Sequence, residues 1–152
     1  MNTFMIFVTG FALCLIYVWA RGGAVERIAM ALQTAAFIAG FAVPKLPRLY
    51  AHTTVSWGFF TIDFTLLVAL TALAIASRRF WPIWVAGLQA ATVMAHVAKA
   101  MVPEMLPIGY GFQIRFWGYG MLLLTAAGTW RHVRRQRLVG HDTSWKWVAS
   151  TR

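Results

Sequence analysis

Five long apolar stretches, interrupted by short polar breaks, constrain this chain more than any other feature of its sequence. They cover residues 3–20, 28–43, 55–77, 80–102 and 108–130. A helix of about 20 apolar residues crosses the ~30 Å hydrocarbon layer of a bilayer. The stretches lack the strict alternation of a transmembrane strand, and they are rich in Ala, Leu and Met. The sequence therefore predicts an all-α integral membrane bundle of five transmembrane helices.

The composition excludes the two main alternatives to a membrane protein. Of the 152 residues, 60% are apolar and 12% are charged, whereas a typical soluble domain has about 25% charged residues. A soluble fold of this size would expose the surplus apolar side chains and aggregate. A disordered chain would be poor in aliphatic and aromatic residues. Residues 1–5 carry no basic residue, so we also expect an uncleaved first helix and not a signal peptide.

The positive charges are divided unequally between the two ends of the predicted helices. In a five-span chain, the breaks near residues 21–27 and 78–79 share one side of the membrane with the residues after 130. That side carries ten of the fourteen Lys and Arg residues. Because cytoplasmic segments carry the excess of Lys and Arg, we predict an N-terminus outside and a cytoplasmic C-terminus. The chain then divides into a five-span bundle (1–130) and a basic cytoplasmic tail (131–152).

Aromatic residues mark the ends of the same stretches. Trp and Tyr prefer the interface between membrane and water. The predicted inner ends carry Trp19, Trp81, Trp84 and Trp130. The predicted outer ends carry Tyr50, Trp57, Tyr110 and Trp117. This pattern agrees with the helix boundaries that the apolar stretches predict.

Small residues at helical spacing indicate where two helices approach closely. In a bilayer, such residues let backbones come together and promote helix packing. The second and fourth stretches contain Ala35, Ala39, Gly40, Gly87, Ala91 and Ala95. We therefore expect the second and fourth helices to form the tightly packed interior of the bundle, although Ala is also common in such helices without this role.

Asp63 is the strongest candidate for a functional residue inside the membrane. Ionisable residues within a span are unfavourable there, so they mark functional sites by default. One face of the fourth stretch, at offsets of three, four and three residues, carries Gln89, Thr92, His96 and Lys99. Because a short turn joins the third and fourth stretches, the register of an antiparallel hairpin predicts that Asp63 and His96 lie at nearly the same depth.

Further polar residues are expected near the outer end, and they complete the predicted intramembrane polar cluster. Gln113 and Arg115 belong to the fifth stretch, and Glu104 stands in the loop before it. Three interpretations of the cluster remain open. It is a buried structural pair or triad that sets helix register, a proton-responsive site in which His96 titrates, or a polar pocket for a lipid headgroup or another amphiphile.

No motif for metal binding or catalysis is present in the sequence. The four His residues and the single Cys have no metal-ligand spacing. Hydrolase, zinc-protease and phosphate-loop motifs are missing as well. His96 is the one His placed within a span, which disfavours a bis-His haem. We therefore predict no metal, no cofactor and no catalytic residue, and we regard an enzymatic role as the less favoured one.

A basic cluster follows the fifth stretch directly. It consists of Arg131, Arg134, Arg135 and Arg137. Such a cluster next to a span is attracted to anionic lipid by about 1 kcal/mol per charge. We therefore predict a topology anchor in contact with anionic lipids. Nucleic-acid binding is not indicated, because the tail is too short for a basic recognition module.

Two segments resemble small multi-pass proteins of alphaproteobacterial inner membranes. They are residues 57–63 and the run Arg79-Phe80-Trp81-Pro82-Ile83-Trp84, which continues to His96. The resemblance extends over about half of the chain. It implies a multi-pass protein of a bacterial inner membrane, and it implies no activity, since those proteins have none assigned.

Three functional hypotheses follow from the sequence. The first is a non-enzymatic accessory or interaction subunit, which packs against a membrane protein partner or against itself as a homo-oligomer. Its basis is that the loops are too short to hold a soluble active site. The second is a proton-linked small transporter or channel that uses Asp63, His96, Lys99 and Arg115. The third is a lipid- or quinone-handling membrane protein that uses the same residues as a pocket.

Overall fold

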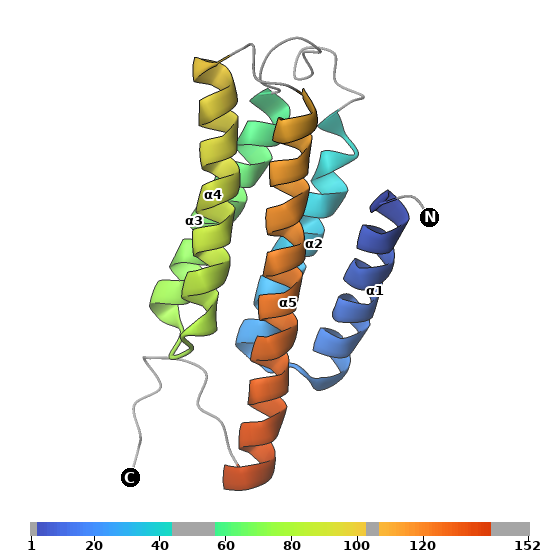
Figure 1. The fold of residues 1–152 in the computed structure, drawn as a ribbon. Coiled ribbons are helices and arrows are strands. Elements are labelled where there is room, and N and C mark those ends of the chain that lie inside the picture. Colours follow the sequence, from blue (N-terminus) through green and yellow to red (C-terminus); the bar gives the residue numbers. More distant parts are fainter. Residues whose placement is uncertain (1–2, 44–56, 103–106, 141–152) are drawn as a thin grey trace.

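The computed structural model describes residues 3–43, 57–102 and 107–140, with the backbone alone at 3, 107–115 and 139. The described residues form five helices and no strand, so the all-α class is confirmed. The helices are α1 (Thr3–Arg21), α2 (Ala24–Gly40), α3 (Trp57–Ala76), α4 (Trp81–Met101) and α5 (Pro107–Val139). Consecutive helices run in opposite directions, up and down the bundle (Figure 1).

Two short breaks connect α1 to α2 and α3 to α4. Both breaks lie at the same end of the bundle (Figure 1). Gly22 follows α1, and a Cβ atom there would lie 2.5 Å from the carbonyl oxygen of Val18, so the turn requires glycine. The second helix begins at Ala24, four residues earlier than the sequence predicts, because Glu26 in its first turn suits the positive end of the helix dipole. Pro82 stands in the first turn of α4, where a missing N–H costs no hydrogen bond.

Helix α5 is much longer than the stretch of 108–130 that predicted it. Its 33 residues correspond to a length of about 50 Å. The helix passes without a break through the basic cluster, and it ends where Gly140 adopts a φ of 76°. It extends beyond the other four helices at the lower end of the bundle (Figure 1). The first nine residues of the predicted tail are therefore helical.

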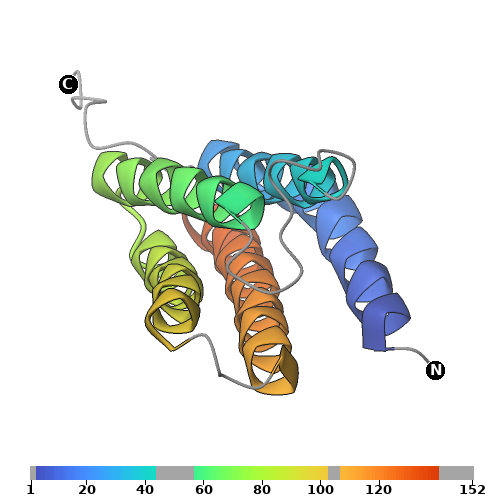
Figure 2. The ribbon, with the colours of Figure 1, turned by 90° about the horizontal axis from the view of Figure 1, so that it is seen from above.

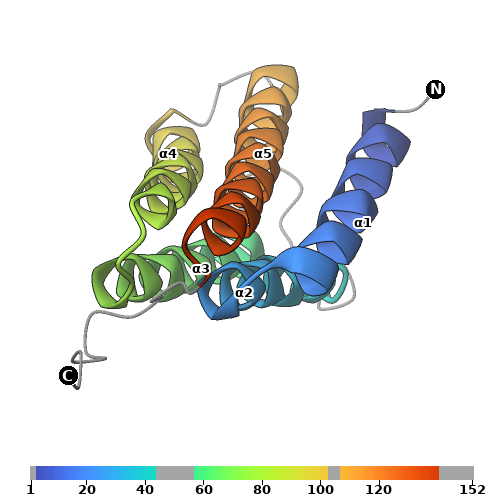
Figure 3. The ribbon, with the colours of Figure 1, turned by 90° about the horizontal axis from the view of Figure 1, so that it is seen from below.

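The helices form two layers. Seen along the bundle, α2 and α3 lie side by side in one layer, and α4, α5 and α1 form the other (Figures 2 and 3). Helix α5 occupies the middle of its layer and packs against α4 on one side and α1 on the other. One apolar core joins α2, α3 and α4 around Leu70 and Val85. A second joins α1, α2 and α5 around Val18 and Met30.

The small residues of the second and fourth stretches, predicted to mark a tightly packed interior, lie in different surroundings in the bundle. Helix α2 packs mainly against α3, and α4 packs against α3 and α5. Ala35 and Ala39 face α3, and a Cβ at Gly40 would meet the ring of Phe59 on α3. On α4, a Cβ at Gly87 would meet nothing within 4 Å.

The exposure of Gly87 reflects a competition between a polar stripe and a stripe of small residues on α4. Its polar stripe, Gln89, Thr92 and His96, is fully buried, and polar groups gain more from hydrogen-bond partners in the interior than small residues gain from close packing. The small residues are turned aside as a result: Gly87 is exposed, Ala91 is partly buried and Ala95 is buried.

Large apolar side chains cover much of the surface of the bundle, and several polar side chains are buried inside it. Long apolar side chains such as Leu13, Ile75 and Leu123 are more than 60% exposed. Among the residues with described side chains, the buried polar and charged ones are Glu26, Gln33, Ser77, Arg79, Gln89, Thr92, His96, Thr125, Thr129 and His132. By length and composition, two of the described helices are apolar enough to cross a membrane, over Phe4–Arg21 and Trp57–Ala76.

The aromatic residues at the helix ends divide into two groups. Trp19, Trp57, Trp84 and Trp130 are exposed, as expected of interfacial residues. Trp81 stands at the start of α4, as predicted, but it is only 7% exposed, because its ring packs against Gly128 of α5. Trp117 is partly buried. Tyr50 and the side chain of Tyr110 lie outside the described residues.

Candidate functional site

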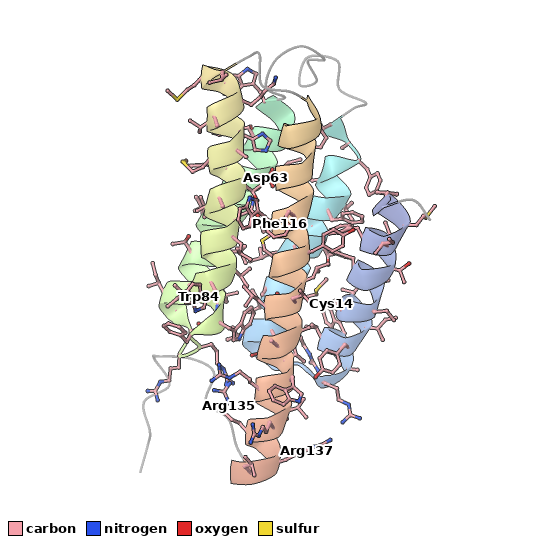
Figure 4. All side chains as sticks on the ribbon, viewed as in Figure 1. Cys14, Asp63, Trp84, Phe116, Arg135 and Arg137 are labelled. Atoms are coloured by element: carbon pink, nitrogen blue, oxygen red, sulfur yellow. The ribbon has the colours of Figure 1, made fainter. Side chains whose placement is uncertain are left out.

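Asp63 of α3 and His96 of α4 form a direct contact inside the bundle. Nε2 of His96 lies 2.8 Å from Oδ2 of Asp63. The His96 side chain is 1% exposed and that of Asp63 is 21% exposed. Phe60 meets the His96 ring edge to face, with 6.1 Å between ring centroids. The contact confirms the common depth that the hairpin register predicts, and Figure 4 shows Asp63 in the upper half of the bundle.

Gln89 holds Asp63 from a second side. Its side chain is fully buried on the same face of α4, two turns before His96. Nε2 of Gln89 donates to Oδ1 of Asp63 at 3.0 Å and to the Asp63 backbone oxygen at 2.9 Å. Both carboxylate oxygens of Asp63 are thus engaged by α4, which fixes the relative height of α3 and α4.

Asp63 and Gln89 also line a pocket of about 310 Å³ to which all five helices contribute. Its polar wall consists of Gln33, Asp63, Gln89 and Thr92. Its aromatic wall consists of Phe7, Phe11, Phe37, Phe41 and Phe59. The rings of Phe11 and Phe37 stack with 4.8 Å between centroids. A pocket with a few convergent polar groups and an apolar remainder is typical of small-ligand sites, whose volumes begin at about 300 Å³.

The described side-chain donors of the polar wall are already in use. Gln33 donates to Thr125 of α5 and to its own helix. Gln89 donates twice to Asp63, and the Thr92 hydroxyl donates to the carbonyl one turn earlier. Acceptors remain, because a carboxylate has about four lone-pair sites and Oε1 of Gln89 is buried without a hydrogen-bond partner. The polar wall therefore presents acceptors to any ligand.

The other residues of the predicted polar cluster stand apart from this pocket or outside the description. Lys99 is partly exposed, three residues beyond His96. Glu104 lies outside the described residues, as do the side chains of Gln113 and Arg115. Their convergence on Asp63 remains a prediction.

A second buried polar cluster, which the sequence analysis missed, lies at the opposite end of the bundle. Glu26 of α2 is fully buried and accepts a hydrogen bond from Nε1 of Trp81 at 3.3 Å. Nη2 of Arg79 lies 3.3 Å from Nδ1 of His132 on α5. Because a guanidinium only donates, Nδ1 of His132 accepts, and a neutral His132 carries its proton on Nε2.

Two glycines make room for this second cluster, which consists of Glu26, Arg79, Trp81 and His132 and is called the inner cluster below. A Cβ at Gly23 would lie 2.7 Å from the His132 ring and 3.1 Å from Oε2 of Glu26. A Cβ at Gly128 would lie 2.6 Å from the ring of Trp81. The cluster thus ties α2, the α3–α4 turn and α5 together at one level. A sequence signal did exist: Glu26 is one of only four acids in the chain and follows a Gly-Gly pair.

The basic residues after position 130 lie on the projecting end of α5. Arg131, Arg134 and Arg137 are exposed there, and Arg135 is partly buried. Figure 4 shows Arg135 and Arg137 at the end of the bundle opposite Asp63. Their contact with anionic lipid remains a prediction.

Comparisons with known proteins yield no relative. No protein-family model, no curated protein and no solved structure matches the chain. Within the described residues, no three His, Cys, Asp or Glu side chains gather closely enough to hold a metal ion. The function is therefore argued from the pocket and from the surface of the bundle.

Proposed function

We propose that this chain is a multi-pass protein of a bacterial inner membrane, and that its internal pocket binds a small amphiphile that carries a hydrogen-bond donor. In this proposal all five helices cross the bilayer, with the N-terminus outside and the C-terminus in the cytoplasm. The observation that carries the function is the pocket itself, which joins an aromatic wall to a polar wall of acceptors around Asp63.

The exposed apolar surface supports the placement in a membrane. Only 17% of the apolar window in α1 and 22% of that in α3 are buried inside the bundle, whereas the core helix of a soluble protein is mostly buried. The remaining surface of these helices suits lipid. Within the interior Asp63 is paired with His96, and Glu26 with Trp81, which is the arrangement expected of polar side chains within a bilayer.

The positions of the basic residues support the orientation. The α1–α2 turn, the α3–α4 turn and the projecting end of α5 all lie at the lower end of the bundle in Figure 1. They carry Arg21, Arg78 and the exposed Arg residues of α5. Because the cytoplasmic side carries the excess of basic residues, this end is the cytoplasmic one.

The chemistry of the polar wall defines the class of ligand. Ligand oxygens that only accept, such as those of a quinone or an ether, find no unused donor among the described side chains of this wall. A hydroxyl or an ammonium group can donate to Asp63. The apolar part of the ligand then packs on the aromatic wall. A phenol, a hydroquinone or a fatty amine fits this description, and the oxidised quinone does not.

A matched pair of probes tests the proposal. 2-Naphthol and its methyl ether have the same ring system and differ in the donor. Binding to the purified protein in detergent, followed by calorimetry, should favour the naphthol. Asp63→Asn should weaken naphthol binding by about tenfold or more, since a hydrogen bond to a charged group is worth about 1.5–3 kcal/mol. Equal affinity for both probes would overturn the assignment of the polar wall.

A second pair of variants separates the pocket from partition into the detergent. Ala36 lines the pocket, so Ala36→Phe should fill it and abolish saturable binding. Ala31 is exposed on the same helix and is not part of the wall, so Ala31→Phe should bind as the unchanged protein does. Loss of binding in both variants would show that either substitution disturbs the fold, and it would not support binding in the pocket.

The accessory role suggested by the sequence is the second candidate function. Its support is the pairing of Asp63 with His96 inside the bundle, together with the open face at Gly87, where another membrane helix can approach closely. Affinity purification in mild detergent tests it: Gly87→Leu should lose a partner that the unchanged protein retains. Recovery of a monodisperse monomer without any partner would reject it.

Proton-linked transport through Asp63 and His96 predicts a measurable flux of protons or substrate across a membrane. Protein in liposomes should carry a pH-dependent current or uptake that Asp63→Asn abolishes. A flux retained in full by that variant would remove Asp63 as the carrier.

A further inference from the structure

A groove of about 600 Å³ runs between α1 and α5 at the basic end of the bundle, well away from the pocket around Asp63. Its α1 side presents Leu13, Ile16, Tyr17, Ala20 and Arg21. Its α5 side presents Trp130, Val133, Arg134 and Arg137. On both helices these residues recur at three- and four-residue spacing, so each set forms one continuous stripe. The groove is therefore the space between two facing helical stripes.

The two ends of this groove differ in chemistry because the helices end at different levels. Helix α1 stops at Arg21, whereas α5 runs on to Val139. The groove is thus apolar beside Leu13 and Ile16, and it becomes cationic beside Arg21, Arg134 and Arg137. An apolar trough that leads into a group of guanidinium side chains matches the shape and charge of a lipid.

The three Arg residues of the groove have no acidic partner among the described residues. Glu26, the acid nearest in sequence to Arg21, is fully buried and bonded to Trp81. Arg134 lies over the ring of Trp130, with 5.7 Å between its guanidinium carbon and the ring centroid. This contact orients the guanidinium at the mouth of the groove. Guanidinium groups bind phosphate oxygens in a bidentate manner, so a phosphate is the anion that the group suits best.

We propose that this groove binds one anionic phospholipid of the cytoplasmic leaflet. The phosphate lies among Arg21, Arg134 and Arg137, and an acyl chain follows the apolar stripe past Ala20 toward Ile16. The inference rests on the proposed membrane placement and orientation, and it is independent of the ligand in the Asp63 pocket. It goes beyond a general attraction of the basic cluster to a charged surface, because it requires Arg21 of α1 and excludes Arg131, which is not part of the groove.

Native mass spectrometry of the protein in mild detergent tests this proposal. The probes are phosphatidylglycerol and phosphatidylcholine with identical acyl chains. We expect one tightly held phosphatidylglycerol per chain and only weak binding of phosphatidylcholine. Equal retention of the two lipids would overturn the role of the Arg residues.

Matched charge variants locate the site. Arg21→Gln and Arg134→Gln should each weaken phosphatidylglycerol binding by about tenfold, as expected when a charge-assisted hydrogen bond is lost. Arg131→Gln removes the same charge from an exposed position outside the groove and should leave binding unchanged. An equal loss of phosphatidylglycerol binding in all three variants would mean that the lipid is attracted by the basic surface in general, and it would overturn the proposal.

A steric pair tests the apolar part of the groove. Ala20→Trp should fill the trough and displace the lipid, whereas Ala12→Trp, at an exposed position on α1 outside the groove, should retain it. Displacement of the lipid by an equal concentration of glycerol 3-phosphate would assign an anion site without an acyl chain. A dimer that forms without lipid and that Ala20→Trp dissociates would assign the groove to a second copy of the chain. Either of these last two results would overturn the proposal.

Discussion

The contact between Asp63 and His96 predicts a specific energetic coupling between two helices. His96→Phe removes the hydrogen bond to Asp63 while a ring stays against Phe60, and Asp63→Asn keeps an acceptor for Gln89 while it removes the charge. The first substitution deletes the imidazole partner and the second removes the carboxylate charge, both with little change in volume. The pair and the double variant together form a double-mutant cycle.

The structure determines the expected size of the effect. Removal of one partner from a fully buried ion pair costs about 3–5 kcal/mol. Asp63 is 21% exposed and keeps its bonds to Gln89, so the free energy of unfolding should fall by about 2 kcal/mol in His96→Phe. In the Asp63→Asn background the same change should cost clearly less. The coupling energy should lie at about 1–2 kcal/mol.

Reversible unfolding in mixed micelles, followed by Trp fluorescence, measures all four free energies of the cycle. The control is Met94→Leu, which lies on the exposed side of α4 away from Asp63 and should change stability by less than about 0.5 kcal/mol. Additive effects of the two single variants would refute the reasoning, because they would mean that Asp63 and His96 do not stabilise each other.

Two further predictions concern the inner cluster. Gly128→Val places a side chain 2.6 Å from the Trp81 ring, so we expect a loss of about 1–3 kcal/mol through overpacking. Gly87→Ala, where a Cβ meets open space, should leave the melting temperature the same or higher; an equal loss in both variants would contradict this. Trp81→Phe removes the indole N–H that donates to Glu26, so the free energy of unfolding should fall by about 1–3 kcal/mol. Trp84→Phe, at an exposed position, should be nearly neutral in chemical unfolding, and a similar cost at both Trp positions would argue against the Glu26 bond.

Much of the fold and one contact of the site follow from local sequence. Apolar stretches of helical length predict the five helices, and the Arg78-Arg79 turn sets the register that brings Asp63 level with His96. That prediction succeeds because a short turn leaves an antiparallel pair of helices little freedom to slide. The burial of Gln89 and Thr92 beside His96 follows from the same helical spacing.

The inner cluster shows why the remainder could not be predicted. Glu26, Arg79, Trp81 and His132 belong to three separate segments of the chain, and their meeting depends on which helices are neighbours. Nothing in the spacing of one helix states which face another helix covers. The small residues of α2 and α4 illustrate the same point: their spacing does not state that α2 packs mainly against α3, or that α4 packs against α3 and α5.

The sequence by itself determined the all-α class, the five helices of the described residues and the equal level of Asp63 and His96, because each depends on composition, on helical period or on one short turn. The tertiary structure alone decided the two layers, the acceptor-lined pocket, the buried Glu26 and the groove that ends at Arg21 and Arg134. These features arise where helices distant in sequence come together. The rotation of each helix about its axis decides which side chains meet at these places. That rotation depends on the burial of the polar groups of all neighbouring helices together.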